Sequence, residues 1–140
     1  MHDILAVRQS VFVVEQNCAY QDADYLDHCA WHLTGRRHDG QIVAYLRVNA
    51  PGSHNVEPSI GRVLTVKTVR GGRLASNALR QALARCETAY PGHAIHIAAQ
   101  VYLVDFYGRF GFKPVGLPYD EDGIAHIDMI RPAAAISDSI

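Results

Sequence analysis

The chain has 140 residues, of which 49% are hydrophobic, and its formal net charge is −1. This length supports one hydrophobic core rather than two, and the near-neutral charge gives no general attraction to nucleic acid or anionic lipid. The apolar runs are shorter than a membrane span and no signal-peptide pattern opens the chain, so the sequence predicts a cytoplasmic protein.

The first part of the chain predicts a helix followed by antiparallel strands. Apolar residues recur at helical spacing after Asp3, which can cap that helix. Asp39-Gly40 is a strong turn signal between two apolar strands. The elements expected here are a helix ending near Val14, a polar loop over 15–27, and strands over 29–36, 41–49 and 59–66.

The second part predicts a strand–helix–strand unit. Apolar residues over 74–90 form one helical stripe, which Pro91-Gly92 ends, and a strand over 94–99 follows. This order implies a parallel strand pair with a right-handed crossover, so the α/β sheet of a single domain over 1–131 is mixed. The segment 132–140 is predicted to be a flexible tail. The remaining expected elements are a helix over 103–110 and a hairpin of strands over 112–117 and 124–130.

Two motifs carry chemical information. Arg70-Gly71-Gly72-Arg73-Leu74-Ala75 links a strand to the long helix. Glycines let backbone N–H groups approach an anion, and a helix N-terminus adds partial positive charge, so this turn is a candidate pyrophosphate site. An ordinary glycine turn is the alternative. The second motif, Phe106-Tyr107-Gly108-Arg109-Phe110-Gly111-Phe112, follows one strand later.

Together these motifs resemble those of the GNAT superfamily, the GCN5-related N-acyltransferases that use acetyl-CoA. The first is similar to the Arg/Gln-x-x-Gly-x-Gly/Ala signature that binds pyrophosphate, and the second to the Phe-Tyr-x-x-x-Gly-Phe segment. Resemblance to the ElaA-type subfamily runs from about Leu5 to Arg131. Its other segments are Val11-Phe12-Val13-Val14-Glu15-Gln16-Asn17-Cys18, Gln21-Asp22, Ile60-Gly61-Arg62-Val63, Ala99-Gln100 and Glu121-Asp122-Gly123-Ile124-Ala125-His126-Ile127.

The resemblance implies the GNAT fold, a mixed, mostly antiparallel sheet whose central parallel pair splays apart between flanking helices. In that family the pantetheine arm of CoA lies in the gap and hydrogen-bonds unpaired strand backbone. Arg73 stands where the family usually has glycine; its guanidinium either reaches a phosphate or is solvated. The cofactor-binding residues implied are Val63, Leu64, Thr65, Arg70, Gly71, Gly72, Arg73, Leu74, Ala75 and Gln100.

The expected reaction transfers an acetyl group to an amine, and the leaving thiolate of CoA then needs a proton. The resemblance implies that Tyr107 supplies it as general acid, although a ring packing on the helix stripe is the alternative. An ammonium acceptor must first lose a proton. Candidate bases or acceptor-site residues are Glu15, Glu57, His28 and His126, and deprotonation by solvent is also open.

No metal is expected, because His28 and His32 would be about 13 Å apart on a strand. Arg62 is expected to pair with a carboxylate inside the groove. The three cysteines are an odd number without metal-type spacing and are expected to be reduced thiols.

The function predicted is an acetyl-CoA-dependent N-acetyltransferase that acts on an unidentified amine by direct attack in a ternary complex. The alternative is a non-catalytic acyl-CoA sensor on the same fold. Acidic residues of the loop over 15–27 (Asp22, Asp24 and Asp27) and of the segment 120–122 either attract a cationic acceptor or are merely solvated. ElaA-type chains usually carry a strand before the first helix, and this sequence, which opens almost inside that helix, is expected to lack it. The sheet edge left open leads to the hypothesis of a homodimer.

Overall fold

The computed structural model describes residues 1–16 and 24–133. Predictions that fall on 17–23, or on the tail beyond 133, lie outside the described residues. The helical elements are α1 (His2–Arg8), the π-helix η1 (Gln9–Glu15), the 3₁₀ turns η2 (Tyr25–His28), η3 (Lys67–Val69) and η4 (Val101–Leu103), and the helices α2 (Leu74–Ala89) and α3 (Val104–Gly108). The strands are β1 (Trp31–Arg36), β2 (Ile42–Asn49), β3 (Ser59–Thr65), β4 (Ile95–Gln100), β5 (Lys113–Glu121) and β6 (Ile124–Arg131).

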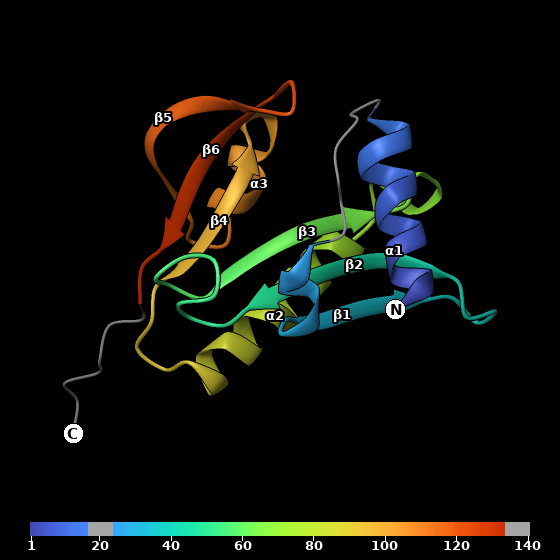
Figure 1. Cartoon of the computed structure of the whole chain (residues 1–140), viewed down its shortest axis with the longest axis horizontal. Helices are drawn as coiled ribbons and strands as arrows, with labels where there is room; N and C mark the ends of the chain where they lie inside the picture. The colour runs from blue at the N-terminus through green and yellow to red at the C-terminus, as the bar shows by residue number, and fades with distance from the viewer. Residues whose placement is uncertain (17–23, 134–140) are drawn as a thin grey trace.

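The strands form one six-stranded sheet in the order β1-β2-β3-β4-β6-β5. Strands β3 and β4 are parallel and joined through α2, whereas the other neighbouring pairs are antiparallel. Helices α1 and η1 lie over one face of β2 and β3, and α2 lies over the other (Figure 1). The predicted mixed sheet with a central parallel pair between helices is therefore confirmed. Within the two described ranges, none of the helices has the length and apolarity needed to cross a bilayer.

Strand β2 is buried along its whole length because helices cover both of its faces. Tyr45 belongs to one apolar cluster, and Leu46 and Val48 belong to another on the opposite side of the strand. The cluster under α1 and η1 contains Ile4, Val11, Ile42, Tyr45 and Leu64. The main core, against α2 and α3, includes Leu46, Val48, Ile60, Leu79, Leu83, Ile97, Phe112 and Met129.

The C-terminal half of the sheet buries one face only. Residues of β4 alternate between the core and a cleft on the opposite face. The core-facing set is Ile95, Ile97 and Ala99, and the cleft-facing set is His96, Ala98 and Gln100. This half of the sheet therefore presents polar side chains on a face that none of the described helices covers.

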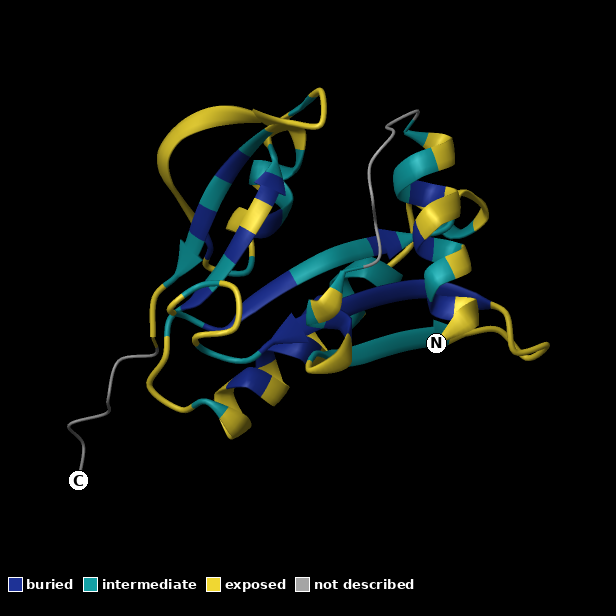
Figure 2. Cartoon of the chain, viewed as in Figure 1, coloured by how far each residue is buried: buried dark blue, intermediate teal, exposed yellow. Residues whose placement is uncertain are grey.

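Strand β5 extends beyond the predicted end at Leu117, so that boundary is wrong. Three of its residues are proline or glycine, which usually interrupt a strand. However, β5 is an edge strand and is exposed throughout (Figure 2). An edge strand tolerates proline because one side of its ladder has no partner. The breakers are Pro114, Gly116 and Pro118, and the pairing with β6 shifts between Val115 and Tyr119.

The first helix also differs from its prediction. It changes at Gln9 from α-helical to π-helical geometry and continues to Glu15, and the N–H of Gln16 donates to the carbonyl of Val11 at 3.2 Å. The predicted loop over 15–27 contains the start of η2, whose Asp24 and Asp27 form a capping box. These acidic residues are consequently held in place rather than merely solvated.

Candidate active site

Strands β3 and β4 are paired over only part of their length. Ser59 lies opposite His96 and Ile60 opposite Ile97, but residues 61–65 of β3 have no partner in β4. The two strands meet at one end and diverge towards the other (Figure 1). The backbone groups of β3 that face the gap are therefore available to a ligand.

A β-bulge in β3 accompanies this divergence. Between the pairs Arg47–Gly61 and Tyr45–Leu64, two residues of β3 face the single residue Leu46 of β2. Arg62 occupies the bulge in left-handed conformation, with φ of 52°. Bulges increase local twist and redirect side chains, and they are common beside active sites. The extra residue turns β3 where its pairing with β4 ends.

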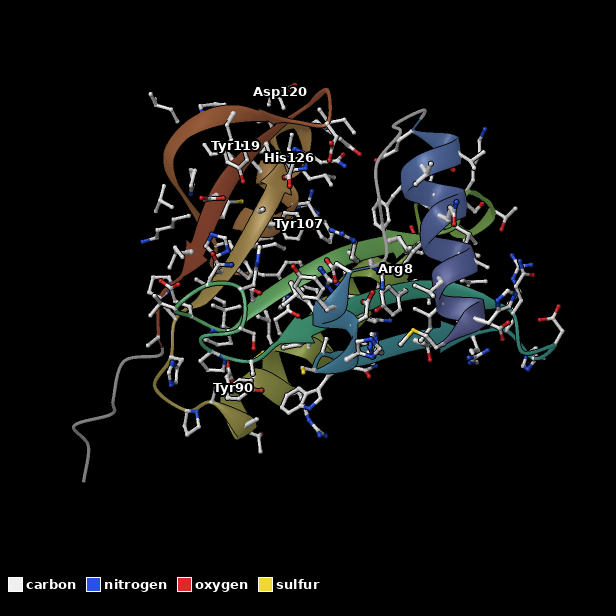
Figure 3. The ribbon with its side chains drawn as sticks, in the orientation of Figure 1. Arg8, Tyr90, Tyr107, Tyr119, Asp120 and His126 are labelled. Atoms are coloured by element: carbon white, nitrogen blue, oxygen red, sulfur yellow. The ribbon has the colours of Figure 1, made fainter. Side chains whose placement is uncertain are left out.

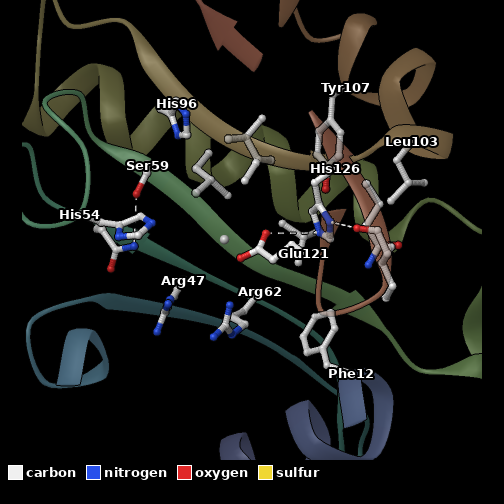
Figure 4. A pocket seen from close by; sticks show the side chains of 18 of the residues that line it. Phe12, Arg47, His54, Ser59, Arg62, His96, Leu103, Tyr107, Glu121 and His126 are labelled. Atoms are coloured by element: carbon white, nitrogen blue, oxygen red, sulfur yellow. Dashed lines mark hydrogen bonds and ion pairs between the residues drawn. The ribbon is translucent and has the colours of Figure 1, made fainter. Parts of the chain in front are cut away.

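A cleft of about 180 Å³ occupies the gap between the strands. Its walls come from η1, β2, the segment 50–58, β3, β4, η4, α3, β6 and the turn between β5 and β6. Figure 4 shows Tyr107 and His126 close to one end of this cleft, and His54 and Ser59 close to the other. We refer to this volume as the splay cleft.

The glycine turn lies between β3 and α2. Gly71 has φ of 87°, a conformation that favours glycine, and Arg73 is the N-cap of α2. No side chain caps this helix, and its first intrahelical bond runs from Asn77 N–H to the Arg73 carbonyl. The preceding N–H groups of the first turn therefore have no helical partner, as an anion site at a helix N-terminus requires. Arg73 is exposed, while Leu74 and Ala75 are half-buried.

Residues predicted to contact CoA occupy different surroundings. Val63 lines the splay cleft, whereas the side chain of Leu64 is buried in the cluster under α1 and η1. Only backbone atoms of Leu64 can therefore face a ligand. Gln100 also lines the cleft, and its Nε2 donates to Oε1 of Gln16 at 3.5 Å. Its Oε1 is buried and, among the described residues, has no hydrogen-bond partner.

Tyr107 lines the splay cleft from α3 and is 5% exposed. Its ring makes edge contacts with Phe106 and Phe112, with centroid separations of 5.1 and 6.1 Å. Burial raises the pKa of the Tyr107 phenol well above its ordinary value, so the hydroxyl keeps its proton. Tyr107 therefore packs in the core and also lines the cleft. A packing role and a role as general acid do not exclude each other.

Of the predicted base candidates, His126 lines the splay cleft and the others do not. His28 is exposed at the end of η2, and Glu57 is half-buried before β3. Glu15 forms an ion pair with Arg70 at 2.7 Å. His126 is therefore the candidate that the geometry brings together with Tyr107.

The His126 ring is held on both sides. Its Nδ1 lies 2.8 Å from the carbonyl oxygen of Ile124, and its ring stacks on Tyr119, which β5 places directly opposite (Figure 3). A carbonyl oxygen only accepts hydrogen bonds, so Nδ1 carries the proton and Nε2 of the neutral ring keeps a lone pair. Nε2 lies 3.8 Å from Oε2 of Glu121.

A buried ion network beneath the cleft was not predicted. The fully buried Arg8 donates to Asp27 at 2.6 Å, and Arg47 bridges Asp27 at 3.0 Å and Asp24 at 2.7 Å. Burial alone would raise the pKa of both carboxyls, but their hydrogen bonds with Arg8 and Arg47 lower it. Arg62 lies 3.6 Å from Asp24, so the predicted pairing of Arg62 with a carboxylate is confirmed.

The sequence did contain a signal for this network. Arg8 lies on the buried stripe of the first helix, four residues after Ile4 and three before Val11, and Arg47 interrupts the apolar run of β2. A charge at a core position predicts a buried counter-ion, because an unpaired one is very costly. The cleft residue His96 was also missed, although the alternation of β4 places it on the face opposite the core. Glu121, by contrast, belongs to the acidic segment 120–122 that the sequence offered as a candidate for attracting a cationic acceptor.

The divergence of β3 from β4 is the one that the GNAT resemblance implied, and it defines the class of acyl-CoA N-acyltransferase folds. A model of the acetyltransferase (GNAT) domain matches residues 10–131. Protein ElaA of Escherichia coli is 39% identical over 134 residues, which cover 94% of this chain and 86% of ElaA. A UPF0039 protein of Synechocystis is 50% identical over 130 residues, which cover 93% of this chain and 84% of that protein.

Solved structures agree with these sequence relatives. An acyl-CoA N-acyltransferase from Pseudomonas aeruginosa matches with a TM-score of 0.88 and 40% identity, and E. coli ElaA with a TM-score of 0.85 and 38% identity. Each match covers 93% of this chain and 88% of the other. The chain therefore belongs to the GNAT acetyltransferase family, within its ElaA-type group.

Proposed function

We propose that this protein is an acetyl-CoA-dependent N-acetyltransferase in which an amine attacks the thioester directly within a ternary complex. The observation that supports this most is the position of Tyr107, which lines the cleft between the splayed strands of a GNAT fold. Family membership supports acyl transfer, and the acetyl donor and amine acceptor are the specific part of the proposal.

The CoA arm fits the features of the cleft and the glycine turn. Backbone groups of Val63 and Thr65 lie in the part of β3 that has no β4 partner, and they would hydrogen-bond the pantetheine amides. The uncapped first turn of α2, from Arg73 to Ala75, would bind the pyrophosphate with Gly71 and Gly72.

The chemistry requires stabilisation of an oxyanion and protonation of a thiolate. We assign the oxyanion to a backbone N–H near Leu64 or Thr65, in the unpaired part of β3. Tyr107 donates its hydroxyl proton to the departing sulfur. Because burial makes a free tyrosinate costly, its proton is replaced from the attacking nitrogen as the C–S bond breaks.

His126 is the proposed base. Its Nε2 lone pair takes the first proton from the acceptor ammonium, and Nδ1–H stays bonded to the Ile124 carbonyl. The nitrogen then forms the N–C bond and loses its second proton, which restores Tyr107. The products are an amide, the free thiol of CoA and one proton carried by His126.

An amine panel with acetyl-CoA, read by mass, tests the function. We expect one or more amines to gain an acetyl group as free CoA appears. Tight acetyl-CoA binding without turnover on any amine would instead favour the acyl-CoA sensor. Absence of acetyl-CoA binding by folded protein, measured by calorimetry, would refute both functions.

A further inference from the structure

The splay cleft contains two acceptor atoms that face each other, and no donor from residues 1–16 or 24–133 hydrogen-bonds to either of them. Nε2 of His126 and Oε2 of Glu121 are 3.8 Å apart, which exceeds hydrogen-bond distance. Because Nδ1 of His126 is satisfied by the Ile124 carbonyl, Nε2 of the neutral ring is an acceptor, and the Glu121 carboxylate only accepts. Two acceptors at this separation suit a shared donor.

This pair of acceptor atoms lies beside Tyr107, so it is placed where the reaction would occur. All three residues line the same cleft, and Figure 4 shows Glu121 and His126 side by side with Tyr107 next to the His126 ring. His96 and Asp128 form a similar pair at 3.6 Å, but His96 lies where β3 and β4 are still paired. Asp128 also already accepts a hydrogen bond from Tyr119 at 2.6 Å.

We propose that the gap between His126 and Glu121 is the binding site for the acceptor nitrogen, and that the acceptor is a primary alkylamine bound as its ammonium ion. This inference rests on the proposed function and specifies its substrate class.

A nitrogen can lie roughly 2.9 Å from both acceptor atoms at once, because twice that distance exceeds their separation. An ammonium group offers one N–H to each acceptor and keeps a third. A hydroxyl group has only one proton to donate, and an uncharged, weakly basic amine gains little from a carboxylate.

The two acceptors then have separate roles. His126 accepts the proton that frees the nitrogen lone pair for attack, and the Glu121 carboxylate stabilises first the ammonium and afterwards the imidazolium. Tyr119 stacks on the His126 ring and limits its rotation. Glu121 is 54% exposed, so the charged acceptor can reach it from solvent.

Binding is tested on the full chain saturated with CoA, with n-butylammonium as the probe and the ring NMR signals of His126 as the readout. Tetramethylammonium is the matched control ligand, since it has the same charge and no N–H. We expect saturable shifts with butylammonium, much weaker ones with tetramethylammonium, and about 10- to 100-fold weaker butylammonium binding in Glu121→Gln.

Glu87→Gln is the control variant. Glu87 is also 54% exposed and pairs with Arg131, outside the splay cleft. We expect Glu87→Gln to bind butylammonium like the wild type. Equal shifts with both ligands, or unchanged affinity in Glu121→Gln, would overturn the ammonium site.

Rates of acetyl transfer to two amines test this inference separately from the proposed function. With acetyl-CoA, Glu121→Gln is expected to raise KM for butylamine while acetyl-CoA affinity stays the same, and to affect methoxyamine, which is uncharged at neutral pH, much less. Equal losses with both amines would overturn the inference while leaving the acetyltransferase function standing. Butylammonium binding with no acetyl transfer to any amine of the panel would support the ammonium site and refute the function.

Discussion

The guanidinium of Arg70 lies 2.7 Å from the carboxylate of Glu15. Arg70 also donates from Nε to the Thr65 carbonyl at 3.0 Å, so it ties the end of β3 to the end of η1. Arg70 begins the proposed pyrophosphate turn. Glu15 is consequently the counter-ion of a proposed phosphate-binding residue, which is a different role from that of a base.

Replacement of Glu15 with Gln separates these two roles. Loss of a half-exposed ion pair frees Arg70 and removes a negative charge beside the bound phosphates, so acetyl-CoA affinity should increase about twofold to fivefold with kcat unchanged. Calorimetry and steady-state kinetics measure the two quantities. Glu57→Gln is the control and should alter neither. A fall in kcat of about 10²-fold or more in Glu15→Gln would instead identify Glu15 as the base.

The two glycines of the turn are predicted to differ. Gly71 has φ of 87°, so Gly71→Val should destabilise the protein by about 1–2 kcal/mol and reduce the rise in melting temperature that acetyl-CoA gives. A Cβ at Gly72 would meet only the Val69 carbonyl, at 3.5 Å, so Gly72→Ala should keep the melting temperature of the free protein. Thermal unfolding with and without acetyl-CoA measures both. An unchanged response in Gly71→Val would argue against the pyrophosphate site.

The buried ion network predicts sensitivity to acid. The pKa values of Asp24 and Asp27 lie below the ordinary value of 3.8 in the folded protein. As pH falls below 3.8, the unfolded chain therefore binds more protons than the folded protein does. The stability that these two carboxylates contribute is fully present above this pH and is lost as pH falls below it. Urea unfolding from about pH 6 to about pH 3 should show the loss.

Asp27→Asn should cost about 3–5 kcal/mol near neutral pH, because Arg8 and Arg47 would keep buried charges with one carboxylate fewer. The variant should also show a flatter pH dependence of unfolding. Glu87→Gln, which breaks an exposed pair, should cost about 0–1 kcal/mol. A similar cost for the two variants would mean that the network contributes little.

Local patterns were sufficient for most of the fold. The helical stripe of α2 and the hairpin signal at Asp39-Gly40 depend on neighbours in sequence, and both were predicted correctly. The splayed pair came from the GNAT resemblance, since periodicity carries no information on where strand pairing ends. The length of β5 was underestimated, because proline and glycine are breakers in a central strand but are tolerated at an edge.

The site was harder to predict because its partners are distant in sequence. Arg8 and Asp27 are 19 residues apart and Arg47 lies a further 20 beyond Asp27. Their pairing depends on how α1, η2 and β2 pack, which composition does not reveal. The choice of His126 among the candidate bases likewise needed the turn between β5 and β6, which brings Glu121 to its ring.

Tyr107→Phe tests the general acid directly. The ring contacts with Phe106 and Phe112 stay, so stability should change little, but the thiolate would leave without a positioned proton. We expect kcat to fall by about 10²–10⁴-fold with acetyl-CoA affinity nearly unchanged, measured by CoA release and calorimetry. The defect should shrink with an acyl donor whose thiol has a lower pKa.

Tyr25→Phe is the control variant. It removes a hydroxyl from a ring that is 87% exposed and should behave as the wild type. Wild-type kcat in Tyr107→Phe, with chemistry rate-limiting, would leave Tyr107 a packing residue, and loss of acetyl-CoA binding would make its hydroxyl a ligand contact.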